Sequence, residues 1–109
     1  MRPLLHGDIV AAARVLLAVP AERREVAMAS LLTASDIADR YRKMMGRAHP
    51  QYGTGSLMAA ASGCRQPSEP ALDDPDYLAC LICVLSVLRR RKQDAARTRE
   101  RDRAATALS

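Results

Sequence analysis

Cys80 and Cys83 form a C-x-x-C pair, a spacing that could supply half of a zinc site or a redox dithiol. A zinc site would need Cys64 and His49 to complete it. However, the pair lies inside an apolar stretch, no strand leads into it, and the chain has no second C-x-x-C. Because buried cysteines behave as small hydrophobes, we expect this pair to belong to the core. The sequence therefore predicts no metal and no other cofactor.

Other constellations could carry chemistry but lack the context that the chemistry needs. The glycine-rich run Gly53–Ser56 could cradle a phosphate, yet it lacks a Gly-Lys-Ser/Thr ending and a preceding strand. His49, Ser56 and an aspartate could be assembled into a hydrolase triad, but there is no nucleophile elbow. The carboxylates of Asp73, Asp74 and Asp76 could bind a cation. However, acidic residues are also favourable at the positive N-terminal end of a helix without any metal. We expect a protein that is not an enzyme.

The segment Arg89–Arg103 carries the whole net charge of the chain, +5. It holds eight Lys/Arg and three Asp/Glu, whereas residues 1–88 hold nine of each. The candidate DNA- or partner-binding residues are Arg89, Arg90, Arg91, Lys92, Arg97, Arg99, Arg101 and Arg103. This segment is interpreted as a solvated helix end, a contact for nucleic-acid phosphates, or a ligand for an acidic groove on a protein.

The composition of this arm narrows those alternatives. No aromatic residue interleaves the arginines, so stacking on single-stranded nucleic acid is not expected. The arm has no bulky apolar face, which argues against an amphipathic membrane helix. Any contact with DNA would therefore be made to the phosphates, would tolerate any base sequence and would weaken with salt.

Four helical segments are predicted to position these residues, and the fold class is all-α. The first, Ile9–Val19, would be capped by Asp8, and the second, Ala21–Met45, would end at Gly46. The apolar seam of the second slips near residues 33–36, which indicates either a kink or a boundary between two helices.

The third and fourth helices follow turn-rich segments. A short helix over Leu57–Ser62 would be capped by Ser56. The fourth would begin at Pro75 with Asp74 as its cap and would run without a break through Arg103. We expect residues 1–88 to form a helical core and oligomerisation domain and residues 89–109 to form a basic C-terminal arm.

The core is expected to be thin. Apolar residues make up 49% of the 109 residues, but twenty are Ala and none is Phe or Trp. A small domain of this kind gains stability by packing against copies of itself or a partner. The residues predicted to build the core and the self-association surface are Val26, Leu32, Ile37, Tyr41, Leu78, Leu81, Leu85 and Leu88.

The sequence favours a cytoplasmic protein without a membrane segment. Asp8 and Arg14 interrupt the N-terminal apolar stretch, which argues against an export signal. The apolar run Leu78–Leu88 is eleven residues long, well short of the about 20 that a membrane span needs. The odd number of cysteines, three, is typical of reduced thiols.

Three stretches together resemble a known family. They are Met1–Asp8 with the Ala-rich helix that follows, the block His49–Ala61, and the helix start Asp74–Tyr77. They are similar to short helical proteins of photosynthetic and marine alphaproteobacteria, identified with the small terminase subunit of gene transfer agents, which are phage-like particles that package host DNA. The resemblance covers residues 1–88.

This resemblance implies a non-enzymatic DNA-packaging subunit that oligomerises and presents DNA to a large terminase subunit with ATPase and nuclease activities. Small terminases usually carry an N-terminal helix-turn-helix, for which residues 1–20 are too short. The expected partners are therefore the large terminase subunit, other copies of the chain, and double-stranded DNA bound weakly and without sequence preference. The alternative is a regulatory protein–protein interaction module without direct DNA contact.

Overall fold

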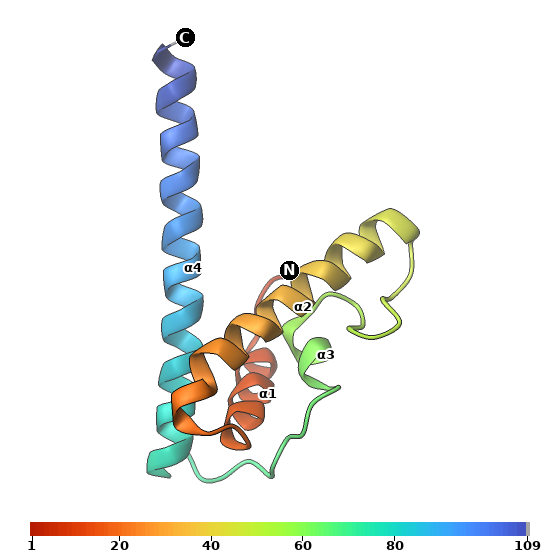
Figure 1. The fold of residues 1–109 in the computed structure, drawn as a ribbon, viewed down its shortest axis with the longest axis vertical. Coiled ribbons are helices and arrows are strands. Elements are labelled where there is room, and N and C mark those ends of the chain that lie inside the picture. Colours follow the sequence, from red (N-terminus) through yellow and green to blue (C-terminus); the bar gives the residue numbers. More distant parts are fainter. Residues whose placement is uncertain (109) are drawn as a thin grey trace.

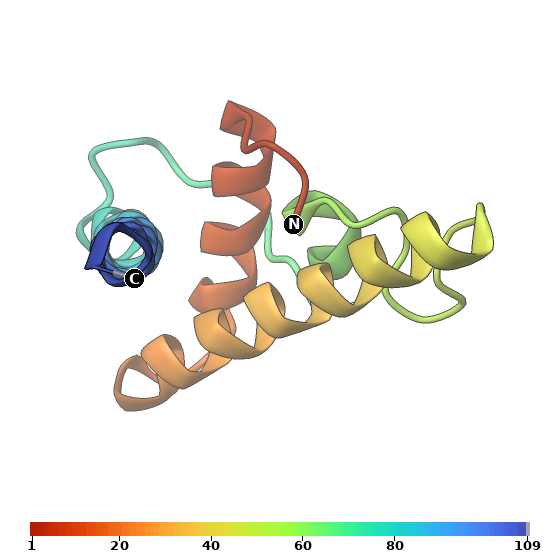
Figure 2. The same cartoon turned by 90° about the horizontal axis from the view of Figure 1, so that it is seen from above.

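The computed structural model describes residues 1–108, which contain four α-helices and no strand, and this confirms the all-α prediction. The helices are α1 (His6–Leu17), α2 (Arg24–Met45), α3 (Leu57–Ala61) and α4 (Pro75–Leu108), and a 3₁₀ turn, η1 (Ala21–Arg23), precedes α2. Figures 1 and 2 show α1 between α4 and α3, with α2 crossing beside it and α4 projecting far beyond the other helices.

The first helix begins earlier than the sequence predicted, and Asp8 is not its N-cap. Leu5 holds the N-cap position, and Asp8 is the third residue of the helix. The Asp8 Oδ2 atom accepts a hydrogen bond from the Leu5 N–H at 2.8 Å, and Oδ1 accepts one from the Met58 N–H at 2.9 Å. Asp8 thus occupies the N3 position of a capping box, where its carboxylate bonds to the backbone of the N-cap residue. The same carboxylate also links α3 to α1.

Two more predicted ends were wrong: α1 ends at Leu17 instead of Val19, and α2 begins at Arg24 instead of Ala21, because residues 21–23 form a 3₁₀ turn. Three predicted ends are confirmed. Gly46 ends α2 with φ of 70°, and its N–H donates to the Arg42 carbonyl at 2.8 Å. The Ser56 Oγ atom accepts from the Ala59 N–H at 3.0 Å, and the Asp74 Oδ2 atom accepts from the Tyr77 N–H at 2.9 Å. There is no boundary between two helices near residues 33–36, because α2 runs through that stretch as one helix.

Small residues on α1 allow the helices to approach closely. Ala11, Ala12 and Ala13 are buried, and α1 packs mainly against α4 and α3. The core is completed by larger side chains from all four helices: Leu16, Met28, Leu32, Leu57, Tyr77, Cys80, Val84 and Leu88. The helices therefore meet over a compact seam that leaves much of α2 and α4 uncovered.

The predicted core residues divide between the interior and the surface. Leu32 and Leu88 are buried, Leu81 packs against the core, and Tyr41 is half-buried outside it. The other four residues were wrongly predicted to lie in the core, because their side chains are 41–70% exposed. They are Val26, Ile37, Leu78 and Leu85. On α4 the reason is rotational, since the face that carries Tyr77, Cys80, Val84 and Leu88 is buried and the opposite face is left open. That these four exposed residues take part in self-association stays a prediction.

Candidate nucleic-acid interface

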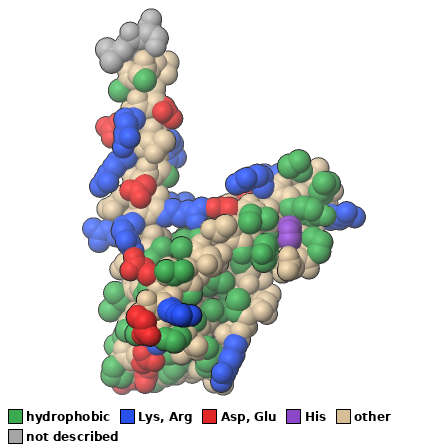
Figure 3. All heavy atoms as spheres, viewed as in Figure 1, with side chains coloured by type: hydrophobic (Ala, Val, Ile, Leu, Met, Phe, Trp, Pro, Cys, Tyr) green, Lys and Arg blue, Asp and Glu red, His purple; other side chains and the backbone are tan. Residues whose placement is uncertain are grey.

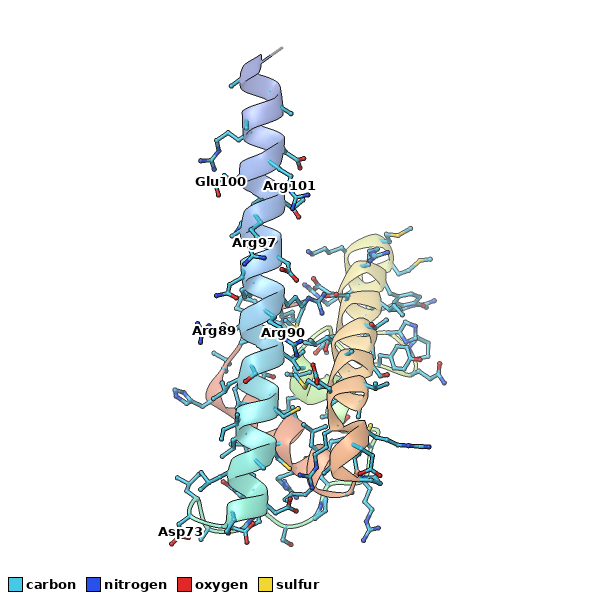
Figure 4. All side chains as sticks on the ribbon, turned by 60° about the vertical axis from the view of Figure 1, so that its left-hand side comes forward. Asp73, Arg89, Arg90, Arg97, Glu100 and Arg101 are labelled. Atoms are coloured by element: carbon cyan, nitrogen blue, oxygen red, sulfur yellow. The ribbon has the colours of Figure 1, made fainter. Side chains whose placement is uncertain are left out.

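Beyond its first turn, the basic arm is a helix that stands clear of the body. Residues 92–107 are all exposed, and Figures 1 and 4 show this part of α4 rising beyond the other helices. At 1.5 Å per residue this stretch is about 24 Å long. Ala, Arg and Glu are good helix formers, which accounts for continuous helix without tertiary contacts. Lys92, Asp94 and Ala95 still border hollows shared with the body, and a polyanion can reach α4 from any side beyond them.

The first turn of the arm is fastened to α2. Arg90 forms an ion pair with Glu25, and Arg91 forms one with Asp36. Glu25 raises the pKa of Arg90 by accepting its hydrogen bond. These two arginines therefore hold α4 against α2, and a phosphate would have to compete with a carboxylate for each of them.

Asp36 belongs to a wider charge network at the middle of α2. The amino group of Met1 lies 3.0 Å from Asp36 Oδ1 and 3.2 Å from Asp39 Oδ2. Asp39 is buried and also contacts Lys43 Nζ at 3.1 Å and Arg42 Nη2 at 3.2 Å. These cations, Lys43 first, lower the pKa of Asp39 to about 2. The network joins the N-terminal segment, α2 and the base of the arm.

An acid titration should reveal this network. The carboxylate of Asp39 has a lower pKa in the folded chain, about 2, than its ordinary value of 3.8, so the unfolded chain binds more protons between these values. The stabilising effect of the ionised carboxylate is present above pH 3.8 and is lost as the pH falls toward 2. We expect Asp39→Asn to be less stable than the parent at pH 6, with a smaller difference at pH about 2. Thermal unfolding followed by circular dichroism checks this, and two parallel pH profiles would contradict it.

The remaining cations of the arm are largely unpaired. Arg97 Nη1 lies 3.7 Å from Asp94 Oδ1, and this is the one i,i+3 pair of the arm that forms within residues 1–108. Five side chains have neither a hydrogen bond nor an ion pair among the described residues: Arg89, Lys92, Arg99, Arg101 and Arg103. The eight candidate residues therefore fall into two groups, of which Arg90 and Arg91 serve the fold and the others face solvent.

Cys80 and Cys83 belong to the core, as the sequence predicted. Cys80 is fully buried and Cys83 packs against the core from its edge. Burial raises the pKa of both thiols, which keeps them protonated and poorly nucleophilic. Cys64 is exposed, and residues 1–108 contain no cluster of three side chains that could hold a metal ion.

The side chains of the loop before α3 that could suggest catalysis have structural roles. The His49 Nδ1 atom accepts hydrogen bonds from the N–H groups of Gln51 at 3.0 Å and Tyr52 at 3.1 Å. The imidazole stacks on the Tyr52 ring with centroids 4.9 Å apart, and the Ser56 hydroxyl caps α3. His49 and Ser56 therefore shape the loop, and nothing in their contacts prepares a nucleophile.

Sequence reasoning missed the acidic partners of the arm. Glu25 and Asp36 are eleven residues apart, which is three turns of α2, so they share a face. That much can be read from the sequence. Their partners, however, lie 65 and 55 residues further along the chain, and no local pattern assigns them.

The comparisons with known proteins place the body of the chain in a family without assigning an activity. No helix within residues 1–108 is long and apolar enough to cross a membrane. No curated protein and no solved structure matches the chain. The model of a domain of unknown function, DUF7742, matches residues 2–88, which is nearly the whole body up to the base of the arm. The chain belongs to the DUF7742 family.

Proposed function

We propose that this chain is a non-enzymatic DNA-packaging adaptor of the small-terminase type. Its helical body would associate with further copies, and the exposed part of α4 would contact the phosphates of double-stranded DNA. The observation that carries the proposal is the free-standing basic helix over residues 92–107, every residue of which is exposed. The packaging role and the large terminase subunit as partner come from the resemblance of residues 1–88.

The charge of a single arm supports weak binding. Residues 92–107 hold five Lys/Arg and three Asp/Glu, so the excess is two positive charges. Contact with phosphates releases counterions from DNA, and each phosphate contact steepens the dependence of affinity on salt by about 0.9. With three to four such contacts, log K against log salt would have a slope of about −3. Such binding is measurable at low salt and weak at physiological salt.

Self-association would strengthen this contact without any new residue. Several arms held on one assembly bind one DNA molecule with a raised effective concentration, so avidity exceeds the affinity of one arm. The binding would stay independent of sequence, because arginines on an exposed helix meet the backbone before the bases. Packaging of host DNA requires this kind of general affinity.

Removing charge from the tip of the arm tests the DNA contact. We expect Arg99, Arg101 and Arg103 changed together to Ala to weaken DNA binding alike for every sequence and to flatten the salt slope by about 2 to 3. Ala preserves helix propensity. The matched control changes three exposed arginines of the body to Ala and removes the same charge: Arg2, Arg47 and Arg65. Gel shift or fluorescence anisotropy across a salt series measures both.

The outcome also separates the two candidate functions. Equal losses in the arm variant and the body variant would contradict a specific role for the arm. Absence of DNA binding by the parent chain at low salt would reject the DNA contact and favour the regulatory protein–protein interaction module. That alternative is supported by the open apolar faces of α2 and α4, which fit a protein partner.

A further inference from the structure

Helix α4 presents an apolar face that nothing in the chain covers. Leu78, Ile82 and Leu85 are 41%, 63% and 53% exposed, and their spacing of four and three residues puts them on one side of the helix. Arg89 continues this line by one further turn. Asp73 lies just before α4 begins, at the N-terminal end of this line. Figure 4 shows Asp73 and Arg89 pointing to the same side of α4, while Arg90 turns toward α2.

Helix α2 presents a second apolar face with charges at both ends. Val26, Ala29, Thr33 and Ile37 follow one another at helical spacing, and all four are exposed. Glu22 lies in the 3₁₀ turn η1 just before α2 begins, and Arg40 follows the line by one turn within α2. Figure 3 shows hydrophobic side chains gathered over α2 on the side seen there. A hollow of about 730 Å³ lies between this line and Val87, Arg90, Arg91 and Asp94 of α4 in the same chain. A second hollow, of about 370 Å³, lies along the line and is bordered by Tyr52.

The two faces complement each other in length and in charge when they are aligned antiparallel. Within the α-helices the two lines match in length, since Val26 to Ile37 on α2 and Leu78 to Arg89 on α4 are each eleven residues, about 16 Å. Antiparallel docking would set Arg89 against Glu22 at one end and Asp73 against Arg40 at the other. Leu78, Ile82 and Leu85 would then lie over the small residues in the middle of α2.

The four terminal charges are available for such a contact. Glu22, Arg40, Asp73 and Arg89 are all exposed, and none of their side chains has a hydrogen bond or an ion pair within the part of the chain that the structure describes. Within one chain the two faces cannot meet, because the outer side of α4 is turned away from α2. The partner that offers both the apolar stripe and the matching charges is a second copy of this chain.

We propose that the outer face of α4 in one copy docks antiparallel on the α2 face of the next copy, with Arg89 against Glu22 and Asp73 against Arg40. The two faces are different surfaces, so the contact is heterologous and repeats from copy to copy. Repetition closes into a ring where the rotation permits. The inference rests on the self-association part of the proposed function and names the surfaces that carry it.

Charge exchange tests this pairing without disturbing the fold, because every residue changed is exposed. We expect Arg89→Glu alone and Glu22→Arg alone each to weaken association about tenfold through like-charge contact. The double variant that carries both changes in one chain restores it, because each interface regains one cation and one anion. Arg47→Glu is the matched control and leaves association unchanged, since Arg47 is exposed and lies outside both faces. Sedimentation velocity without DNA measures the mass, and circular dichroism checks the helix content.

The apolar centre has its own test. Ile82→Asp should weaken association at least about thirtyfold, as expected for a central contact residue. Met45→Asp, at a similarly exposed methionine beyond the α2 stripe, should leave it unchanged.

Each alternative outcome overturns a defined part of the inference. Restoration by Arg89→Glu with Asp73→Arg, and not with Glu22→Arg, would overturn it in favour of a symmetric contact between two α4 helices. Failure of both double variants to restore association would overturn the pairing while leaving self-association in place. A parent chain that stays monomeric at about 100 μM, far above the Kd range of specific interfaces, would overturn self-association itself. None of these outcomes depends on DNA, so the DNA contact of the arm is judged separately by the salt series.

Discussion

Arg24→Ala is expected to lower the free energy of unfolding by about 3 kcal/mol, because it leaves buried polar groups without a partner. Arg24 is 8% exposed, and its Nε atom donates to the carbonyls of Leu16 at 3.0 Å and Val19 at 3.1 Å. Its Nη1 and Nη2 atoms lie 2.8 Å and 3.1 Å from the two carboxylate oxygens of Asp76. One side chain thus joins the end of α1, the start of α2 and the first turn of α4.

The contribution of Asp76 to this joint should be the smaller one. Its carboxylate is 59% exposed, so water can replace the guanidinium when the pair is broken. Asp76→Asn is therefore the control, and we expect a clearly smaller loss than for Arg24→Ala. Urea unfolding followed by circular dichroism measures both variants. Equal losses would show that the ion pair, rather than the two carbonyl contacts, holds the joint.

Gly55→Ala is expected to cost about 3 kcal/mol, because it combines backbone strain with a collision against a helix. Gly55 has φ of 100°, which L-residues rarely adopt, and a Cβ atom there would lie 2.8 Å from the Cα atom of Asp39. The obstacle is the backbone of α2, which cannot turn aside as a side chain can. The Arg2 N–H also donates to the Gly55 carbonyl at 3.2 Å, so this close approach helps place the N-terminal segment.

Gly46→Ala provides the matched control for the collision. Gly46 has φ of 70°, but nothing lies within 4 Å of the added Cβ atom. The change keeps the strain and lacks the clash, so we expect a cost of about 1 kcal/mol. The difference between the two variants in urea unfolding measures the close approach of the loop to α2. Equal costs would contradict this account of the block His49–Ala61.

The helices and most of their ends could be predicted because local rules set them. Ser56 and Asp74 stand where a cap satisfies a free backbone N–H, and Gly46 stands where a helix needs a left-handed residue. Asp8 misled because an aspartate serves equally as N-cap or at the third helical position. The Asp8 carboxylate also accepts a hydrogen bond from the N–H of Met58, fifty residues away, and this contact cannot be predicted from the local sequence.

The side that each helix buries could not be predicted as well. Helix α4 is apolar nearly all round in its first half, so periodicity does not choose between Leu78, Leu85 and the buried Tyr77, Val84. Packing against α1 determines which face of α4 is buried, and it leaves Leu78 and Leu85 exposed to solvent. The same limit applies to the arm, where only the tertiary partners Glu25 and Asp36 separate Arg90 and Arg91 from the free arginines.

The most direct test of this account is the mass of the intact chain. Native mass spectrometry of the purified protein, at near-physiological ionic strength and without DNA, reports how many copies associate. We predict an oligomer of many identical copies, closed into a ring where the rotation permits, because the α2 and α4 faces are different surfaces that repeat from one copy to the next. A monomer, or a dimer that adds no further copies, would contradict the account and favour the regulatory interaction module.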